Sequence, residues 1–259
     1  MKSKRRVESM MKDLLNKEYI RQRIAPKPGD IDYLHLSDLL IALERLIPPG
    51  ASRVLDFGCG GSPYRPLFGE CTYHRADLIG TPQIDFEYGH DSRLPEGVTR
   101  YDCVLSTQVL EHVEDPLSYL QECNRVLKPG GHLLLTTHGV FEDHACPYDF
   151  WRWTAFGLQR LVKDAGFELN ELKKLTTGPR ATLYLTQREL HRISFNKSGW
   201  YGRLMNFGVR AVQRLGSARL HEASDQSFSS NRVVDADEIG HNLYIVIAIL
   251  AHRPNVKSK

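Results

Sequence analysis

The sequence predicts an α/β domain with a mostly parallel β-sheet, and three observations support this. Short apolar segments that suit strands alternate with segments of helical periodicity from about residue 53 to residue 175. Such alternation is typical of β–α–β units, in which successive strands run parallel. The composition, with 41% hydrophobic and 25% charged residues, is that of an ordinary globular protein. A length of 259 residues suits one large domain with an appended segment.

Two helices are expected before the sheet, in an N-terminal helical segment over residues 1–50. Apolar side chains recur at helical spacing over residues 7–24, and Pro26-Lys27-Pro28-Gly29 ends that helix. A second amphipathic helix is predicted over residues 33–47, because Pro48-Pro49-Gly50 stops the pattern there.

The sheet is expected in a core formed by residues 51–180 together with residues 241–253. Its predicted strands cover residues 53–57, 73–78, 83–86, 101–106, 132–137, 167–175 and 242–251. Pro116 suits the first turn of a helix that runs to residue 127, and Thr154 suits the cap of a helix that Gly166 ends. Residues 181–240 interrupt the alternation, which predicts a helical insertion or lid before the last strand.

Composition also bears on partners and compartment. The net charge of +3 gives no basic excess of the kind that nucleic-acid-binding domains carry, so a nucleic-acid partner is not expected. The five cysteines are odd in number and form no Cys-x-x-Cys pair, so neither a disulfide framework nor a zinc site follows. This cysteine usage, without a secretory signal or an apolar stretch near the ~18 residues that span a bilayer, predicts a cytoplasmic protein.

The sharpest feature is the glycine-rich turn after the first strand, Asp56-Phe57-Gly58-Cys59-Gly60-Gly61. Closely spaced glycines let the backbone bend tightly and approach a ligand without a Cβ in the way. A plain glycine turn gives the same pattern, and a dinucleotide site would want a third glycine where Pro63 stands. Because Asp56 disfavours a pyrophosphate and suits a cationic amino group, the loop indicates a ligand with a ribose and a positive charge.

Two more acids follow at positions that suit a nucleoside. Asp77 ends the second strand about 20 residues after the loop, where a ribose diol is held in nucleotide-binding sheets. Asp91 suits a residue that accepts a hydrogen bond from an adenine amino group. The plainer interpretation is that Asp91 forms the turn before Leu94-Pro95. A solvated acid at a strand end is the alternative interpretation of Asp77, but its occurrence together with Asp56 favours a ligand contact.

These segments form a series that continues along the chain. The series is Asp56-Phe57-Gly58-Cys59-Gly60, Asp77, Asp91-Ser92-Arg93-Leu94-Pro95, Tyr101-Asp102-Cys103-Val104-Leu105, Val109-Leu110-Glu111-His112-Val113 and Leu127-Lys128-Pro129-Gly130-Gly131. It resembles the class I S-adenosylmethionine-dependent methyltransferases, in the small-molecule branch that includes quinone-precursor and polysaccharide-cluster enzymes. The resemblance implies S-adenosylmethionine as the cofactor. It also implies a Rossmann-like sheet of seven strands, the last one antiparallel, with helices on both faces.

The resemblance also assigns roles to single residues. Asp56, Gly58 and Gly60 would line the methionine end of the cofactor, with Cys59 between them. The remaining contacts expected from the resemblance are Asp77 and Leu78 at the ribose, Asp91 and Ser92 at the adenine, and Gln108 at the sulfonium.

A methyl acceptor that reacts through oxygen must lose its proton, and histidine is the usual base near neutral pH. His112, His138 and His144 compete for this role; His112 and His144 are preferred, although each also suits a structural histidine. No metal is expected, because Gln108 replaces the first acid of the Glu-x-x-Glu-His motif that binds a divalent ion in some related enzymes.

The acceptor is expected to be a small molecule that offers a hydroxyl group, on a sugar, a glycolipid intermediate or a phenolic ring. An NAD-dependent oxidoreductase and a catalytically silent cofactor-binding scaffold are the alternatives.

The insertion holds a predicted amphipathic helix over residues 199–220, whose apolar side chains would cover the sheet or the active site. The residues of that expected apolar face are Tyr201, Leu204, Met205, Val209, Val212 and Leu215. Because Arg203, Arg210 and Arg214 lie opposite, peripheral contact with an anionic membrane surface is the alternative.

Overall fold

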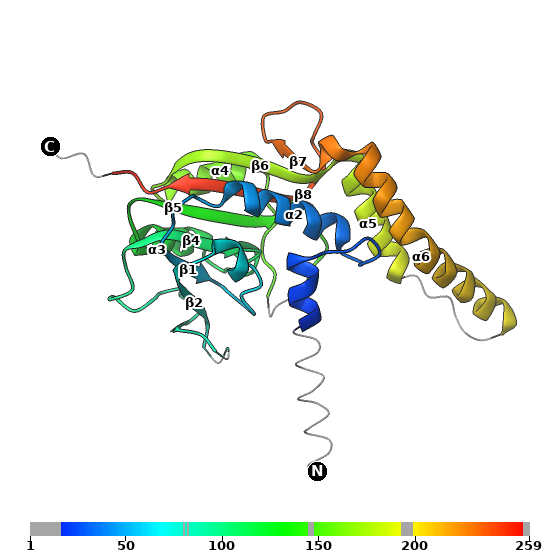
Figure 1. The fold of residues 1–259 in the computed structure, drawn as a ribbon, viewed down its shortest axis with the longest axis horizontal. Helices are drawn as coiled ribbons and strands as arrows, with labels where there is room; N and C mark the ends of the chain where they lie inside the picture. The colour runs from blue at the N-terminus through cyan, green and yellow to red at the C-terminus, as the bar shows by residue number, and fades with distance from the viewer. Residues whose placement is uncertain (1–16, 80, 82, 145–147, 193–198, 256–259) are drawn as a thin grey trace, which may run out of the picture.

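An eight-stranded sheet forms the centre of the computed structural model, which describes residues 17–79, 81, 83–144, 148–192 and 199–255. The strands lie in the order β3-β2-β1-β4-β5-β8-β6-β7 (Figure 1). Their bounds are β1 Arg53–Phe57, β2 Thr72–Leu78, β3 Phe86–Tyr88, β4 Tyr101–Thr107, β5 Leu127–His138, β6 Glu168–Thr177, β7 Val233–Asp235 and β8 Tyr244–His252. β1 to β5 pair in parallel, whereas β8 runs antiparallel to both β5 and β6. The predicted mostly parallel α/β sheet with an antiparallel last strand is therefore confirmed.

The strand count departs from the prediction of seven. The additional strand, β7, lies in the segment that was expected to be wholly helical and pairs antiparallel with the edge strand β6. A strand of three residues is too short to show the alternation by which strands are recognised in a sequence. β3 also lies later than predicted, at Phe86–Tyr88 rather than over residues 83–86.

Helices cover both faces of the sheet, as predicted. Residues 17–24 are helical, and the other helices are α2 Tyr33–Leu46, α3 Pro116–Val126, α4 Ala155–Asp164, α5 Gly178–Arg192 and α6 Trp200–Ser227. One apolar cluster packs α3 and α4 on one face, through residues such as Cys123 and Leu158. A second cluster packs α2 and α5 on the other face, through residues such as Leu43 and Tyr184. The expected caps form, because Asp115 accepts from Ser118 N and Thr154 from Gly157 N.

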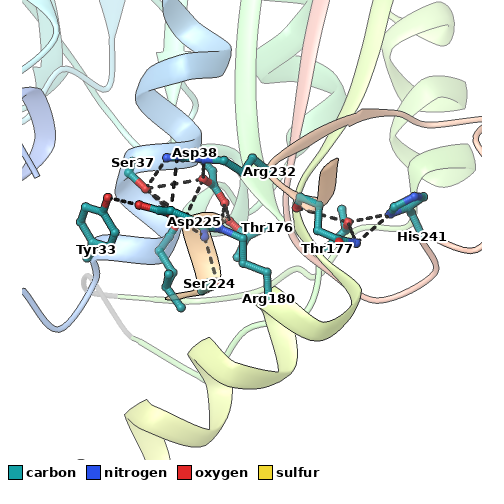
Figure 2. Close-up of polar contacts among 12 residues, drawn as sticks. Tyr33, Ser37, Asp38, Thr176, Thr177, Arg180, Ser224, Asp225, Arg232 and His241 are labelled. Carbon is teal, nitrogen blue, oxygen red and sulfur yellow. Dashed lines mark hydrogen bonds and ion pairs between the residues drawn. The ribbon is translucent and has the colours of Figure 1, made fainter. Parts of the chain in front are cut away.

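A buried ionic cluster joins α2 to α5 and α6 (Figure 2). Asp38 of α2 and Arg180 of α5 are both fully buried, and Arg180 Nε lies 2.7 Å from Asp38 Oδ2. Arg232 Nε binds the other carboxylate oxygen at 2.7 Å, and Asp225 of α6 pairs with Arg180 at 2.8 Å. Thr176 at the end of β6 donates to Asp38 at 2.9 Å. The two acids and two arginines thus compensate each other and hold α2, α5 and α6 together.

Figure 1 shows that α6 runs away from the sheet, with its first residues at the end farthest from it. No helix in the described part of the chain is both long and apolar enough to pass through a bilayer.

Candidate active site

A cavity of about 470 Å³ opens where β1, β2, β4 and β5 end. Its walls include Gly58 after β1, Asp77 at the end of β2, Gln108 after β4 and His138 at the end of β5. Ligands of parallel sheets bind beyond the carboxyl ends of the strands, so this is the position where such a fold places its site.

The glycine-rich loop has the shape that its sequence predicts. Gly58 has a φ of +78°, and a Cβ built there would lie 2.5 Å from Cγ2 of Val109, which also lines the cavity. Only glycine fits this position, both for its backbone angle and for its close approach to the neighbouring loop. Cys59 and Gly60 continue the cavity wall.

Asp77 ties this loop to the end of β2. Its Oδ2 accepts a hydrogen bond from Gly60 N at 2.6 Å, and its Oδ1 accepts from Leu78 N at 2.7 Å. Asp77 and Leu78 both line the cavity, as does Ser92, which is buried. The carboxylate is therefore at the place where the sequence predicts a ribose contact.

Asp56 and Asp91 are not among the described residues that line the cavity. Side chains alternate along β1, so Asp56 points to the face opposite Leu55 and Phe57, where Tyr73 OH donates to its carboxylate at 2.7 Å. Burial raises the pKa of Asp56 to about 7. Asp91 Oδ1 accepts from Arg93 N at 3.3 Å and forms the turn that was its plainer interpretation. Asp56 thus lies beside Tyr73 and not among the described residues of the cavity wall, and its contact with the cofactor stays a prediction.

Gln108 is held in an unusual conformation at the cavity wall. Its φ is +56°, a value that non-glycine residues seldom adopt. Its Nε2 donates to Thr136 Oγ1 at 3.1 Å, while its buried Oε1 has no partner. A buried acceptor without a donor costs free energy, so this oxygen is suited to a bound ligand.

Histidines gather where the cavity wall follows β4 and β5. The rings of His112 and His144 lie 4.8 Å apart between centroids, and both residues line the cavity. His144 Nδ1 lies 3.3 Å from Asp149 Oδ2, and Arg152 holds the same oxygen at 2.6 Å. Burial keeps the pKa of His144 below its ordinary value of 6.5, so the imidazole is neutral and able to accept a proton at neutral pH. His112 Nδ1 instead pairs with the carbonyl oxygen of Tyr148 at 2.6 Å.

Glu111 and His138 lie next to this pair; His138 was the less favoured candidate for the base, and no role was predicted for Glu111. Glu111 is fully buried, accepts from Thr137 Oγ1 at 2.8 Å, and has its Oε1 3.3 Å from His138 Nε2. Burial raises the pKa of Glu111 to about 7 and lowers that of His138 well below its usual value. Glu111, His138 and His144 each bring a ligand atom within 4.8 Å of the others, so these three residues could hold a divalent cation. No local sequence pattern indicates this cluster, since the three residues come from separate segments.

The wall of the cavity also includes residues from the N-terminal segment and from α5, which the sequence did not indicate. These residues are Tyr19, Arg23, Asp32, His35, Leu36, Leu39, Tyr184 and Arg188. Arg188 of α5 pairs with both Asp32 and Glu142, which links the insertion to the chain on either side of the cavity. Periodicity predicts that these segments are helical but not which surface they cover, so only the tertiary structure reveals this wall.

A family of proteins described as a methyltransferase domain matches residues 32–172, which contain the loop, Asp77, Gln108 and the histidine end of the cavity. The chain belongs to the class I S-adenosylmethionine-dependent methyltransferases. S-adenosylmethionine is accordingly its cofactor.

Individual relatives agree with this assignment. The methyltransferase is 26% identical over 183 residues to a ubiquinone biosynthesis O-methyltransferase of Marinobacter nauticus, a match that covers 57% of this chain and 77% of the relative. It is 31% identical over 149 residues to a probable S-adenosylmethionine-dependent methyltransferase of Mycolicibacterium smegmatis, covering 51% of this chain and 58% of that one. Among solved structures, a possible histamine N-methyltransferase of Thermotoga maritima superposes with a TM-score of 0.54 at 16% identity, over 92% and 95% of the two chains. At that identity the superposition shows the fold alone.

Proposed function

We propose that this methyltransferase methylates a hydroxyl oxygen of a small acceptor, and that a phenolic ring is the preferred class. The observation that carries the proposal is the His144–Asp149 pair at the cavity wall. Nδ1 of His144 contacts the Glu142 carbonyl oxygen at 3.3 Å and lies 3.3 Å from Asp149 Oδ2, which leaves Nε2 as the nitrogen that takes a proton from the acceptor hydroxyl. A neutral amine acceptor has a free electron pair and needs no such base.

The residues of the cavity fit S-adenosylmethionine. The space that a Cβ at Gly58 would fill and the unpaired Gln108 Oε1 both lie at the end of the cavity beside β1 and β4. We assign the ribose to Asp77, the adenine to the segment around Ser92, and the methionine end to Gly58, Cys59 and Gly60. Gln108 Oε1 would face the sulfonium. When bound, the cofactor supplies an electrophilic methyl group on a good leaving group.

The acceptor would lie between the cofactor and the histidines. The cavity is lined by the aromatic side chains of Tyr64, Phe141, Tyr148, Phe150 and Tyr184. Flat aromatic walls favour a planar ring over a sugar, because ring faces stack on one another. The ubiquinone biosynthesis O-methyltransferase relatives support an oxygen acceptor, since their name states transfer to oxygen.

A transfer assay with methyl-labelled S-adenosylmethionine tests the acceptor class. Simple catechols and phenols, monosaccharides and primary amines would be compared at equal concentration. We expect label in the aromatic hydroxyl compounds, with a rate that rises as the pH is raised through the pKa of His144. Label in the amines and in none of the hydroxyl compounds would contradict the proposal.

A further inference from the structure

The first three turns of α6 present large apolar side chains to solvent. Trp200, Leu204 and Phe207 are 72%, 54% and 71% exposed and follow the i, i+4, i+7 spacing of one helical face. Tyr201 lies beside them, 63% exposed, with its ring against that of Trp200. Exposed apolar groups of this size and proximity mark an interaction surface rather than ordinary scatter. We call these four residues the α6 apolar face.

The α6 apolar face is not the side by which the helix packs on the protein. In the same turns the buried positions are Gly202 and Asn206, two small residues on the opposite side of the helix. Tyr201 and Leu204, which were expected to cover the sheet or the active site, are instead exposed, and the side chains of Val212, Arg214 and Leu215 lie outside the described residues. The large apolar side chains of these turns are therefore the ones that face solvent.

The charge around the α6 apolar face is of one sign. Residues 199–221 contain four arginines and no acidic residue. Arg203 and Arg210 are exposed on either side of Phe207, and neither has a carboxylate partner in the described part of the chain. Elsewhere in the molecule arginines are commonly paired, as Arg180, Arg188 and Arg152 are.

We propose that the α6 apolar face rests on an anionic lipid surface. An interfacial helix buries aromatic and aliphatic side chains at the level of the lipid headgroups and pairs flanking arginines with phosphate. Tryptophan and tyrosine suit this interface, because each combines an apolar ring with a polar group. A second copy of the chain fits less well, since two such faces would bring unpaired arginines together.

Co-sedimentation with vesicles tests the proposal. The intact chain should bind vesicles that contain phosphatidylglycerol at low salt and bind pure phosphatidylcholine far more weakly. Changing Arg203 and Arg210 to glutamine should weaken binding about fivefold for each arginine. Changing Trp200, Leu204 and Phe207 to serine should weaken it about tenfold or more for each side chain. Emission from Trp200 should shift to the blue on binding, and a Trp200→Phe variant should lose that shift.

A matched control is Phe156→Ser on α4, which removes an aromatic side chain that is 85% exposed outside the α6 apolar face. This variant should bind vesicles like the unchanged chain. Cofactor affinity and the thermal midpoint, measured on every variant, confirm that the fold is retained. No binding to anionic vesicles at low salt, or equal binding by the triple serine variant, would overturn the proposal. The proposal would also be overturned if the chain failed to bind vesicles and formed a dimer in sedimentation velocity that the triple serine variant abolishes.

Discussion

Changing His144 to alanine should lower kcat by about 10²–10⁴-fold, the range for loss of a general base. The affinity for S-adenosylhomocysteine should stay the same, because His144 follows β5, whereas Gly58 follows β1 and Asp77 ends β2, and β4 lies between β1 and β5 in the sheet. Steady-state kinetics and calorimetry on the same preparations measure the two quantities. A matched control is His132→Ala, since His132 lies earlier on β5 and is not among the described residues that line the cavity.

The pH dependence gives an independent check. His144 acts as a base only when neutral, and burial lowers its pKa below 6.5, so kcat should fall only as the pH drops below that value. Asp149→Asn removes the charge that pairs with Nδ1 and should lower kcat less than His144→Ala does. Activity should survive a chelator. If EDTA abolished it and a divalent ion restored it, His144 would be a metal ligand with Glu111 and His138. If instead His112→Ala lost the activity and His144→Ala kept it, the base would be His112.

Changing Asp38 to alanine should lower the free energy of unfolding by about 3–5 kcal/mol, as for other buried ion pairs that lose one partner. Arg180 is fully buried and, among the described carboxylates, would keep only Asp225 as a partner, while Arg232 would lose its Asp38 contact (Figure 2). Urea unfolding measures the loss. Asp235→Ala is the control, because Asp235 forms an exposed pair with Lys173 and should matter little.

A double variant distinguishes two causes of the lost stability: the lost attraction between the two charges, and the cost of a buried charge left without its partner. Changing Asp38 and Arg180 together to leucine removes both buried charges, and such replacements can be nearly neutral. We expect the double variant to be more stable than Asp38→Ala alone. An equal or greater loss of unfolding free energy in the double variant would mean that the hydrogen bonds of the cluster, and not charge compensation, hold the helices together.

The core of the fold is predictable from the sequence because its signals are local. β1 and the following glycines, the capped starts of α3 and α4, and the long apolar run of β8 each show themselves within a few residues. β7 escapes prediction, because three residues carry no periodicity and their pairing with β6 is a tertiary contact. The buried Asp38–Arg180 pair joins residues 142 positions apart, so no local pattern indicates it.

Half of the cavity could be predicted and half could not. The loop, Asp77 and Gln108 follow directly from strand ends, where a parallel sheet concentrates its ligand contacts. The orientation of Asp56 could also be predicted, since side-chain alternation along β1 places it on the face opposite Phe57. The contributions of Asp32, His35 and Arg188 depend on how distant helices pack, and the exposed side of α6 depends on small residues that carry no hydrophobic signal.

The central claim is that the cofactor lies in this cavity with Asp77 as a direct contact. Calorimetric titration with S-adenosylhomocysteine, on the unchanged chain and on Asp77→Ala, tests it most directly. Glu87→Ala is the matched control, because Glu87 is an exposed acid that lies opposite Asp77 in the register of β2 and β3. We expect Asp77→Ala to weaken binding about tenfold or more and Glu87→Ala to leave it unchanged. Equal affinity in all three proteins, or binding of NAD in place of S-adenosylhomocysteine, would contradict the account.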